Sequence, residues 1–148
     1  MLQKVSTEEI VNLLESALPI TGNIIRSSNW FRWSDGDSPK AIYVSQCKPS
    51  SYSKGNWYYE FFHTLSSKSM DKILQNHHNV VLIDYATRRF TILDHEDISW
   101  VSENSSRVRK KGGLVTDFVV RMTESEYYLE PSLAGTGLYR TIEVREFQ

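Results

Sequence analysis

The N-terminal segment shows the clearest helical spacing of apolar residues. Between residues 10 and 18 apolar side chains recur three and four positions apart, which is typical of a helix with one buried face. Ser6 and Glu9 have the spacing of a capping box, and Pro19 ends the pattern. We therefore predict a helix over residues 7–18 that covers a sheet with its apolar face.

The next part of the chain alternates β-prone stretches with polar turns. Residues 23–33 and 41–48 are β-prone and flank a turn rich in Asp, Gly, Ser and Pro. After a polar loop, residues 57–65 form an aromatic run whose residue types favour a strand. Three strands are thus expected after the first helix.

A second helix and an apolar hairpin follow. Serines at the start of residues 66–78, with Met70, Ile73 and Leu74 on one face, predict a helix there. Residues 79–85 and 89–95 read as a hairpin, and its nearly all-apolar first arm is typical of a central strand.

The remaining segments complete an α+β pattern. Residues 95–101 predict a short helix or turn, residues 102–113 an exposed loop or hairpin tip, and strands are expected over 114–122, 126–131 and 141–147. No internal repeat or interdomain linker interrupts the chain. We predict one globular domain over residues 1–148, with a mixed, mostly antiparallel sheet of about seven strands and two or three helices.

Charge and composition narrow the functional classes. The 17 basic and 18 acidic side chains give a net charge of −1, so any contact with nucleic acid must rely on a local patch. The single cysteine, Cys47, has no partner within the chain, the N-terminus has no signal-like segment, and no apolar run approaches the roughly 20 residues of a membrane span. These features predict a cytoplasmic protein without a membrane role.

Candidate chemistry is concentrated in residues 34–49. The alternation of a strand places Ile42, Val44, Gln46 and Lys48 on one face, so a core-facing row ends in an amide and an amine. Two acids, Asp35 and Asp37, stand on the preceding turn. These groups could converge on a metal ion, or they could be the polar ends of an ordinary hairpin.

The order of an acid, a short gap, then Gln, any residue and Lys resembles the PD-(D/E)XK nucleases, and the Gln form resembles the Mrr-type restriction endonucleases. The resemblance implies that Asp37 or Asp35 and Gln46 hold Mg²⁺ and that Lys48 orients or activates the attacking water. It also implies that a glutamate of the first helix joins the metal shell, and Glu15 is the candidate. Oxygen ligands for Mg²⁺ and a cation near the developing charge are what phosphodiester hydrolysis requires.

Aromatic and basic residues suggest a second type of site. Trp57, Tyr58 and Tyr59, together with Arg32, could stack on a base and hold a phosphate, although a strand buried on both faces has the same pattern. Four cations lie close together in the most polar segment and could contact phosphates or serve solubility alone: Arg107, Arg109, Lys110 and Lys111.

Three classes therefore remain open from the sequence. The first is a nucleic-acid-processing protein of restriction or defence type, acting as a Mg²⁺-dependent endonuclease through Asp37, Gln46 and Lys48. The second is a non-catalytic module that binds DNA through a modified base or phosphates. The third is a protein-interaction domain, including a homodimer formed through the aromatic surface.

Overall fold

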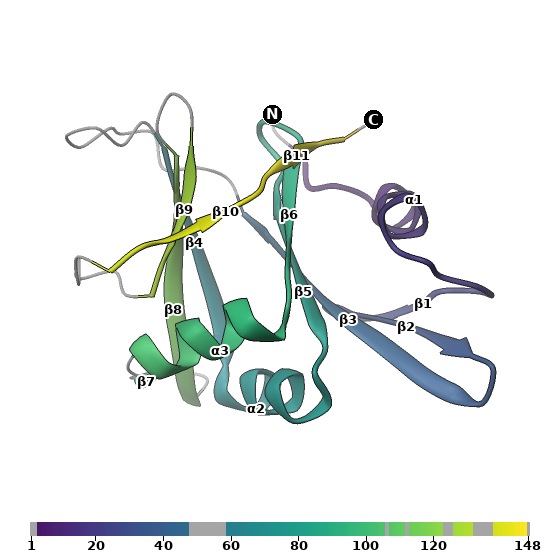
Figure 1. Cartoon of the computed structure of the whole chain (residues 1–148), viewed down its shortest axis with the longest axis horizontal. Coiled ribbons are helices and arrows are strands. Elements are labelled where there is room, and N and C mark those ends of the chain that lie inside the picture. The colour runs from purple at the N-terminus through teal and green to yellow at the C-terminus, as the bar shows by residue number, and fades with distance from the viewer. Residues whose placement is uncertain are drawn as a thin grey trace.

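The computed structural model describes residues 3–47, 59–105, 107–111, 113–122, 126–131 and 138–147. Two sheets and three helices make up this part of the chain (Figure 1). The first sheet, sheet A, has six strands in the order β1-β2-β3-β5-β6-β11, and only β3 and β5 pair in parallel. Its strands are β1 (Ile25–Ser27), β2 (Trp30–Asp35), β3 (Ser38–Cys47), β5 (Asn79–Asp84), β6 (Arg89–Leu93) and β11 (Arg145–Glu146).

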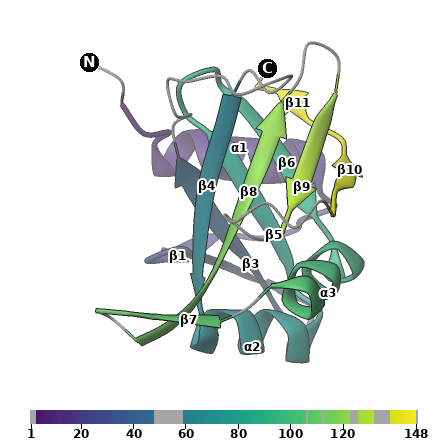
Figure 2. The same ribbon diagram turned by 90° about the vertical axis from the view of Figure 1, so that its left-hand side faces the viewer.

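The second sheet, sheet B, is antiparallel and has the strand order β10-β9-β8-β4. A further short strand, β7, pairs with the beginning of β8 and forms a hairpin with it. The strands are β4 (Tyr59–Ser66), β7 (Arg107–Lys110), β8 (Gly113–Met122), β9 (Tyr127–Glu130) and β10 (Arg140–Ile142). Figure 2 shows sheet B in front of sheet A, with α1 (Thr7–Ala17) on the far side.

Helix α1 covers one face of sheet A. The capping box is formed as expected, since the Ser6 hydroxyl accepts from the Glu9 amide and the Glu9 carboxylate accepts from the Ser6 amide. The apolar face of α1 then packs on the strands below it and buries a cluster made of Val5, Ile10, Leu13, Leu14, Phe31, Ile42, Val44, Val81, Ile83 and Phe90.

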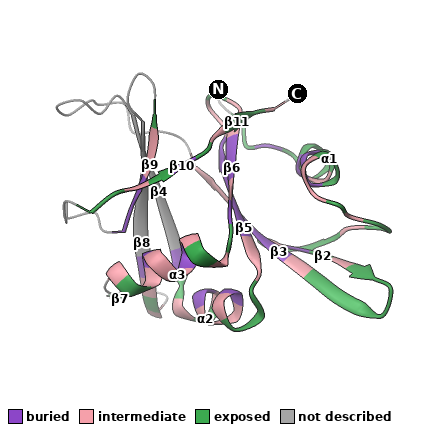
Figure 3. Ribbon diagram, in the orientation of Figure 1, coloured by how far each residue is buried: buried purple, intermediate pink, exposed green. Residues whose placement is uncertain are grey.

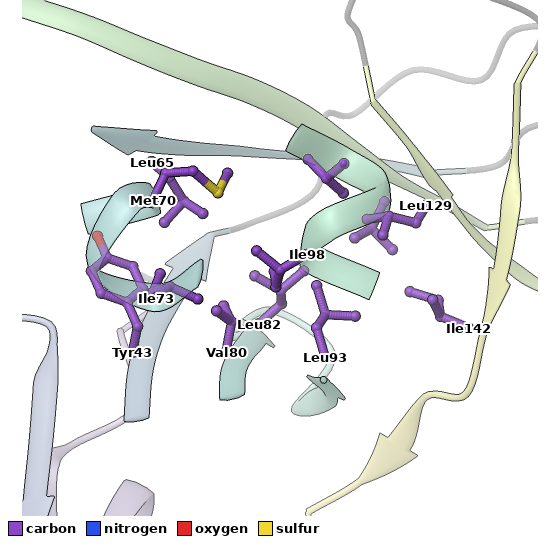
Figure 4. Close-up of a cluster of buried hydrophobic side chains, with 12 residues drawn as sticks. Tyr43, Leu65, Met70, Ile73, Val80, Leu82, Leu93, Ile98, Leu129 and Ile142 are labelled. Atoms are coloured by element: carbon purple, nitrogen blue, oxygen red, sulfur yellow. The ribbon is translucent and has the colours of Figure 1, made fainter. Parts of the chain in front are cut away.

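Two helices lie against the opposite face of sheet A and join it to sheet B: α2 (Ser67–Asn76) and α3 (His95–Asn104). Asp94 caps α3 with a second capping box, and α2 ends at His77 in the left-handed conformation. The buried cluster between these layers contains Tyr43, Leu65, Met70, Ile73, Val80, Leu82, Leu93, Ile98, Val101, Val120, Leu129 and Ile142 (Figure 4).

The α+β class and three helices are confirmed, and β5 is a central strand as expected. The mixed, mostly antiparallel sheet is also confirmed, and it has six strands, while the other described strands form a second sheet. Residues 23–33 contain two strands rather than one, since Ser28 at φ 57° turns the chain from β1 into β2. The last predicted strand also divides, with β10 in sheet B and β11 in sheet A.

The contact of α1 with sheet A leads to a stability prediction. Leu14 is 0% exposed, so Leu14→Ala should lower the free energy of unfolding by about 2–5 kcal/mol, through lost apolar burial and a residual cavity. Glu15→Ala, at the exposed neighbouring position, should stay within about 0.5 kcal/mol of the parent protein. Urea denaturation followed by circular dichroism measures both, and equal losses would contradict the proposed packing of α1.

Candidate functional site

The two acids of the predicted metal site lie at the tip of the β2–β3 hairpin. Asp35 ends β2, Asp37 is in the turn, and both are exposed. Gln46 lies near the other end of β3, and the strand from Ser38 to Gln46 spans roughly 26 Å at the usual rise per residue. The structure therefore does not bring Asp35 or Asp37 together with Gln46, because one straight strand separates them.

Gln46 instead has a structural partner. Its side-chain Oε1 accepts from the Val5 amide at 2.8 Å, and its Nε2 donates to the Val5 carbonyl at 3.1 Å. The carboxamide thus satisfies both backbone groups of a buried residue just before α1. Alternation along β3 placed Gln46 on the α1 face as predicted, and there it attaches the start of α1 to the sheet.

The other members of the predicted metal site do not complete it either. Glu15 is exposed, outside the buried face of α1, and Lys48 lies outside the described residues. Across the described part of the chain, no three His, Cys, Asp or Glu side chains gather into a metal-binding group. The described members of this set, Asp35, Asp37, Gln46 and Glu15, do not fit one Mg²⁺ ion.

At the end of β3, burial and a nearby carboxylate oppose ionisation of the Cys47 thiol. Burial raises the pKa of Cys47 to about 12, and the neighbouring Asp84 carboxylate adds to the rise. Asp84 itself accepts from the Ala86 and Thr87 amides at 2.9 and 3.3 Å and so closes the turn between β5 and β6. Both groups therefore serve the fold.

The predicted base-stacking residues cannot be placed. Trp57 and Tyr58 lie outside the described residues, and Tyr59 begins β4 with its side chain also outside the described part. Arg32 is exposed on β2, and its guanidinium lies over the ring of Trp30, 5.5 Å from the centroid.

The cluster of four cations forms a hairpin, one of the two alternatives predicted from its polarity. Arg107, Arg109 and Lys110 belong to β7, and Lys111 is in the turn before β8. Arg107 forms an ion pair with Asp71 of α2 at 2.7 Å. Arg109 and Lys111 are exposed, and the side chain of Lys110 lies outside the described part.

A second group of cations surrounds Trp30, which sits half-buried where β2 meets α2. The ammonium group of Lys72 is 4.6 Å from the centre of the indole ring that Arg32 also approaches. The two cations therefore lie within about 10 Å of each other, close to the Debye length at 0.1 M salt. Cation–π attraction to the indole ring of Trp30 holds both side chains there.

His78 lies beside these cations, and burial and their charge lower its pKa. Its ring packs edge-on against Trp30, with centroids 5.5 Å apart. Burial lowers its pKa from 6.5, and the positive charges of Lys72, Arg32 and Lys40 lower it further. None of these three cations forms an ion pair with a carboxylate that the structure describes. The cluster is therefore a local excess of positive charge.

These side chains line an open groove, which we call the cation groove. It borders the α2-facing side of the β2–β3 hairpin, and the pair Trp33 and Lys40 reaches it from the α1-facing side. Its lining consists of Gly22, Asn23, Ile25, Arg32, Trp33, Ser34, Pro39, Lys40, Ala41, Lys72, Asn76 and His78. Alternation along β2 could have placed Trp30 and Arg32 on one face from the sequence. Lys72 lies in the middle of α2 and His78 follows the end of this helix. Both are distant from β2 in sequence, so no local pattern predicts that they join this site.

Comparisons of the chain with protein-family models, with curated proteins and with solved structures found no match. In the described part of the chain, the helices are all too short or too polar to cross a membrane.

The pairing of Gln46 with Val5 leads to a prediction that separates a structural from a catalytic role. Gln46→Leu should lower the free energy of unfolding by about 1–3 kcal/mol, because both buried backbone groups of Val5 lose their partners. Asp37→Asn, at the exposed tip, should change it by less than about 0.5 kcal/mol. Chemical denaturation tests this, and an unchanged stability of the Gln46 variant would contradict the structural role.

Proposed function

We propose that the protein is a nucleic-acid-binding module whose phosphate site is the cation groove. The observation that carries this proposal is the pair of cations Arg32 and Lys72 over Trp30, with Lys40 as a third positive charge acting on His78, and no ion pair from any of them to a described carboxylate. Mutual repulsion within such a cluster is relieved when an anion binds, and phosphate suits arginine and lysine together. Restriction or defence as the setting, Mg²⁺-dependent cleavage and self-association remain predictions from the sequence.

The position of the β7–β8 hairpin indicates that the ligand is a polymer rather than a small anion. Asp71 of α2 contacts Arg107 of this hairpin, while the next residue, Lys72, contacts Trp30 in the cation groove. The two cationic regions therefore flank one helix, whose width with side chains is about 10–12 Å (Figure 1). A nucleic-acid backbone crossing α2 can reach both regions, with Arg109 and Lys111 exposed on the second.

The net charge of −1 is compatible with this proposal because three of the described arginines away from α2 form ion pairs. Arg88 pairs with Glu9, Arg89 with Glu146, and Arg140 with Asp97. We therefore expect a polyanion to bind at the surface around α2, and its affinity should depend steeply on salt because bound counterions are released from the nucleic acid.

Removing charge from the groove tests the proposal. The double variant Arg32→Ala, Lys72→Ala should bind labelled DNA more weakly, and its plot of log affinity against log salt should be shallower by about 1.4–1.8 units, because two phosphate contacts are lost. Fluorescence anisotropy at several salt concentrations measures both quantities.

A matched control removes a cation from the opposite end of the molecule. Arg145 lies on β11, remote from α2, so Arg145→Ala should leave both affinity and salt slope near the parent values. Absence of DNA binding by the parent protein, or equal effects of the groove and control variants, would refute the proposed function.

The depressed pKa of His78 predicts that binding strengthens on acidification. The free protein keeps this imidazole neutral near pH 7, whereas a phosphate beside it favours the protonated form, so the complex takes up a proton. Affinity should therefore rise between about pH 7.5 and about pH 5.5, by at most about tenfold per pH unit for one proton. His78→Gln should flatten this dependence in the same anisotropy measurement.

Two controls accompany the pH titration. A histidine with a lowered pKa in the folded state destabilises the fold as pH falls below about 6.5, so circular dichroism must show that the protein stays folded at each pH. His77→Asn removes the neighbouring imidazole at a left-handed position that asparagine tolerates, and it should keep the pH dependence of the parent protein. Loss of the dependence in this control would contradict the role of His78.

A further inference from the structure

We infer that the cation groove binds unpaired nucleotides, so that the preferred ligand is single-stranded nucleic acid rather than duplex. This inference rests on the proposed function and concerns the class of nucleic acid. Three features of the hairpin and its surroundings carry it: a floor of small side chains, amide groups on both walls, and an acidic tip.

The α2-facing floor of the groove is formed by two cross-strand pairs of β2 and β3, which lie outside the pair of Trp30 and Tyr43. Trp30 and Tyr43 pair nearest the core, Arg32 pairs with Ala41, and Ser34 pairs with Pro39 farther out. Alternation puts all of these on the α2-facing side. On the α2-facing side the side chains beyond Arg32 are small, and this part of the hairpin is largely exposed (Figure 3). A planar base can lie over such a floor, next to the cations at its inner end.

The walls supply groups that recognise the edge of a base. Asn23 lines one side of the groove, and Asn76, near the end of α2, lines the other. Asn76 uses its amide nitrogen on the Lys72 carbonyl at 3.0 Å, so its Oδ1 remains as an acceptor. Within the described residues, the Asn23 side chain makes no hydrogen bond. Amides offer donors and acceptors that match the Watson–Crick edge, which only an unpaired base exposes.

The acidic tip opposes a duplex. Asp35 and Asp37 are both exposed at the far end of the hairpin, beyond Ser34 and Pro39. A duplex laid along the hairpin would bring the phosphates of its second strand toward these carboxylates, and like charges repel. A single strand that enters the groove beside α2 does not need to pass the tip. The acids that the sequence suggested as metal ligands thus acquire a role in selecting the ligand.

The test compares a short labelled single strand with the duplex formed from it and its complement, with both ligands measured at the same series of salt concentrations. The parent protein should bind the single strand about tenfold more tightly, in line with the free energy of accommodating one base. Asn23→Ala, Asn76→Ala should weaken single-strand binding severalfold without changing the salt slope, since no charge is removed. Asp35→Asn, Asp37→Asn should raise duplex affinity and leave single-strand affinity nearly unchanged.

The failure of this inference can be distinguished from failure of the proposed function. If the Arg32 and Lys72 variants weaken both ligands while the parent binds duplex as tightly as single strand, only the inference is overturned. An unchanged single-strand affinity of the Asn23, Asn76 variant overturns it as well. Lack of binding to both ligands removes the proposed function too. Circular dichroism of each variant confirms that the exposed substitutions leave the fold intact.

Discussion

Burial of sheet A on both faces is the constraint on which the rest of the structure depends. Its middle strand, β5, is buried from Val80 to Asp84, so apolar side chains point in both directions and each face needs its own cover. Helix α1 supplies one cover, while α2, α3 and sheet B together supply the other. Neither cover extends over the outer half of the β2–β3 hairpin, which is why two paired strands project from the core with both faces largely in contact with water.

The cation groove is a consequence of this arrangement. Ile73 and Met70 of α2 belong to the same buried cluster as Tyr43 of β3, and Trp30 packs against this cluster. This packing places Lys72 over Trp30. The indole then belongs partly to the core and partly to the groove, and its edge-on contacts with Tyr43 and His78 fix its orientation. Positive charge is therefore held at this place by packing, and the functional proposal depends on packing as much as on charge.

Local features of the fold could be predicted from the sequence, and distant ones could not. The spacing of Ser6 and Glu9, the apolar run of β5 and the alternation of β3 are properties of neighbouring residues, and all three are confirmed. The pairing of Gln46 with Val5 joins residues 41 positions apart, and Trp30 and Lys72 are equally remote in sequence. An acid before a Gln-x-Lys pattern brings the acid and the glutamine together only if the hairpin is short. Because β3 is ten residues long, Asp37 lies far from Gln46.

The C-terminal part of the chain has a mechanical consequence. Strands β10 and β11 follow each other directly, yet β10 is the edge of sheet B and β11 is the edge of sheet A. Between them, the Glu143 carbonyl accepts from the Thr91 hydroxyl at 2.6 Å. This segment links the two sheets, because separating them would require breaking the hydrogen bonds of β10 with β9 or those of β11 with β6. Fluctuations that open one layer are thereby transmitted to the other, and the two layers should loosen together as one cooperative unit.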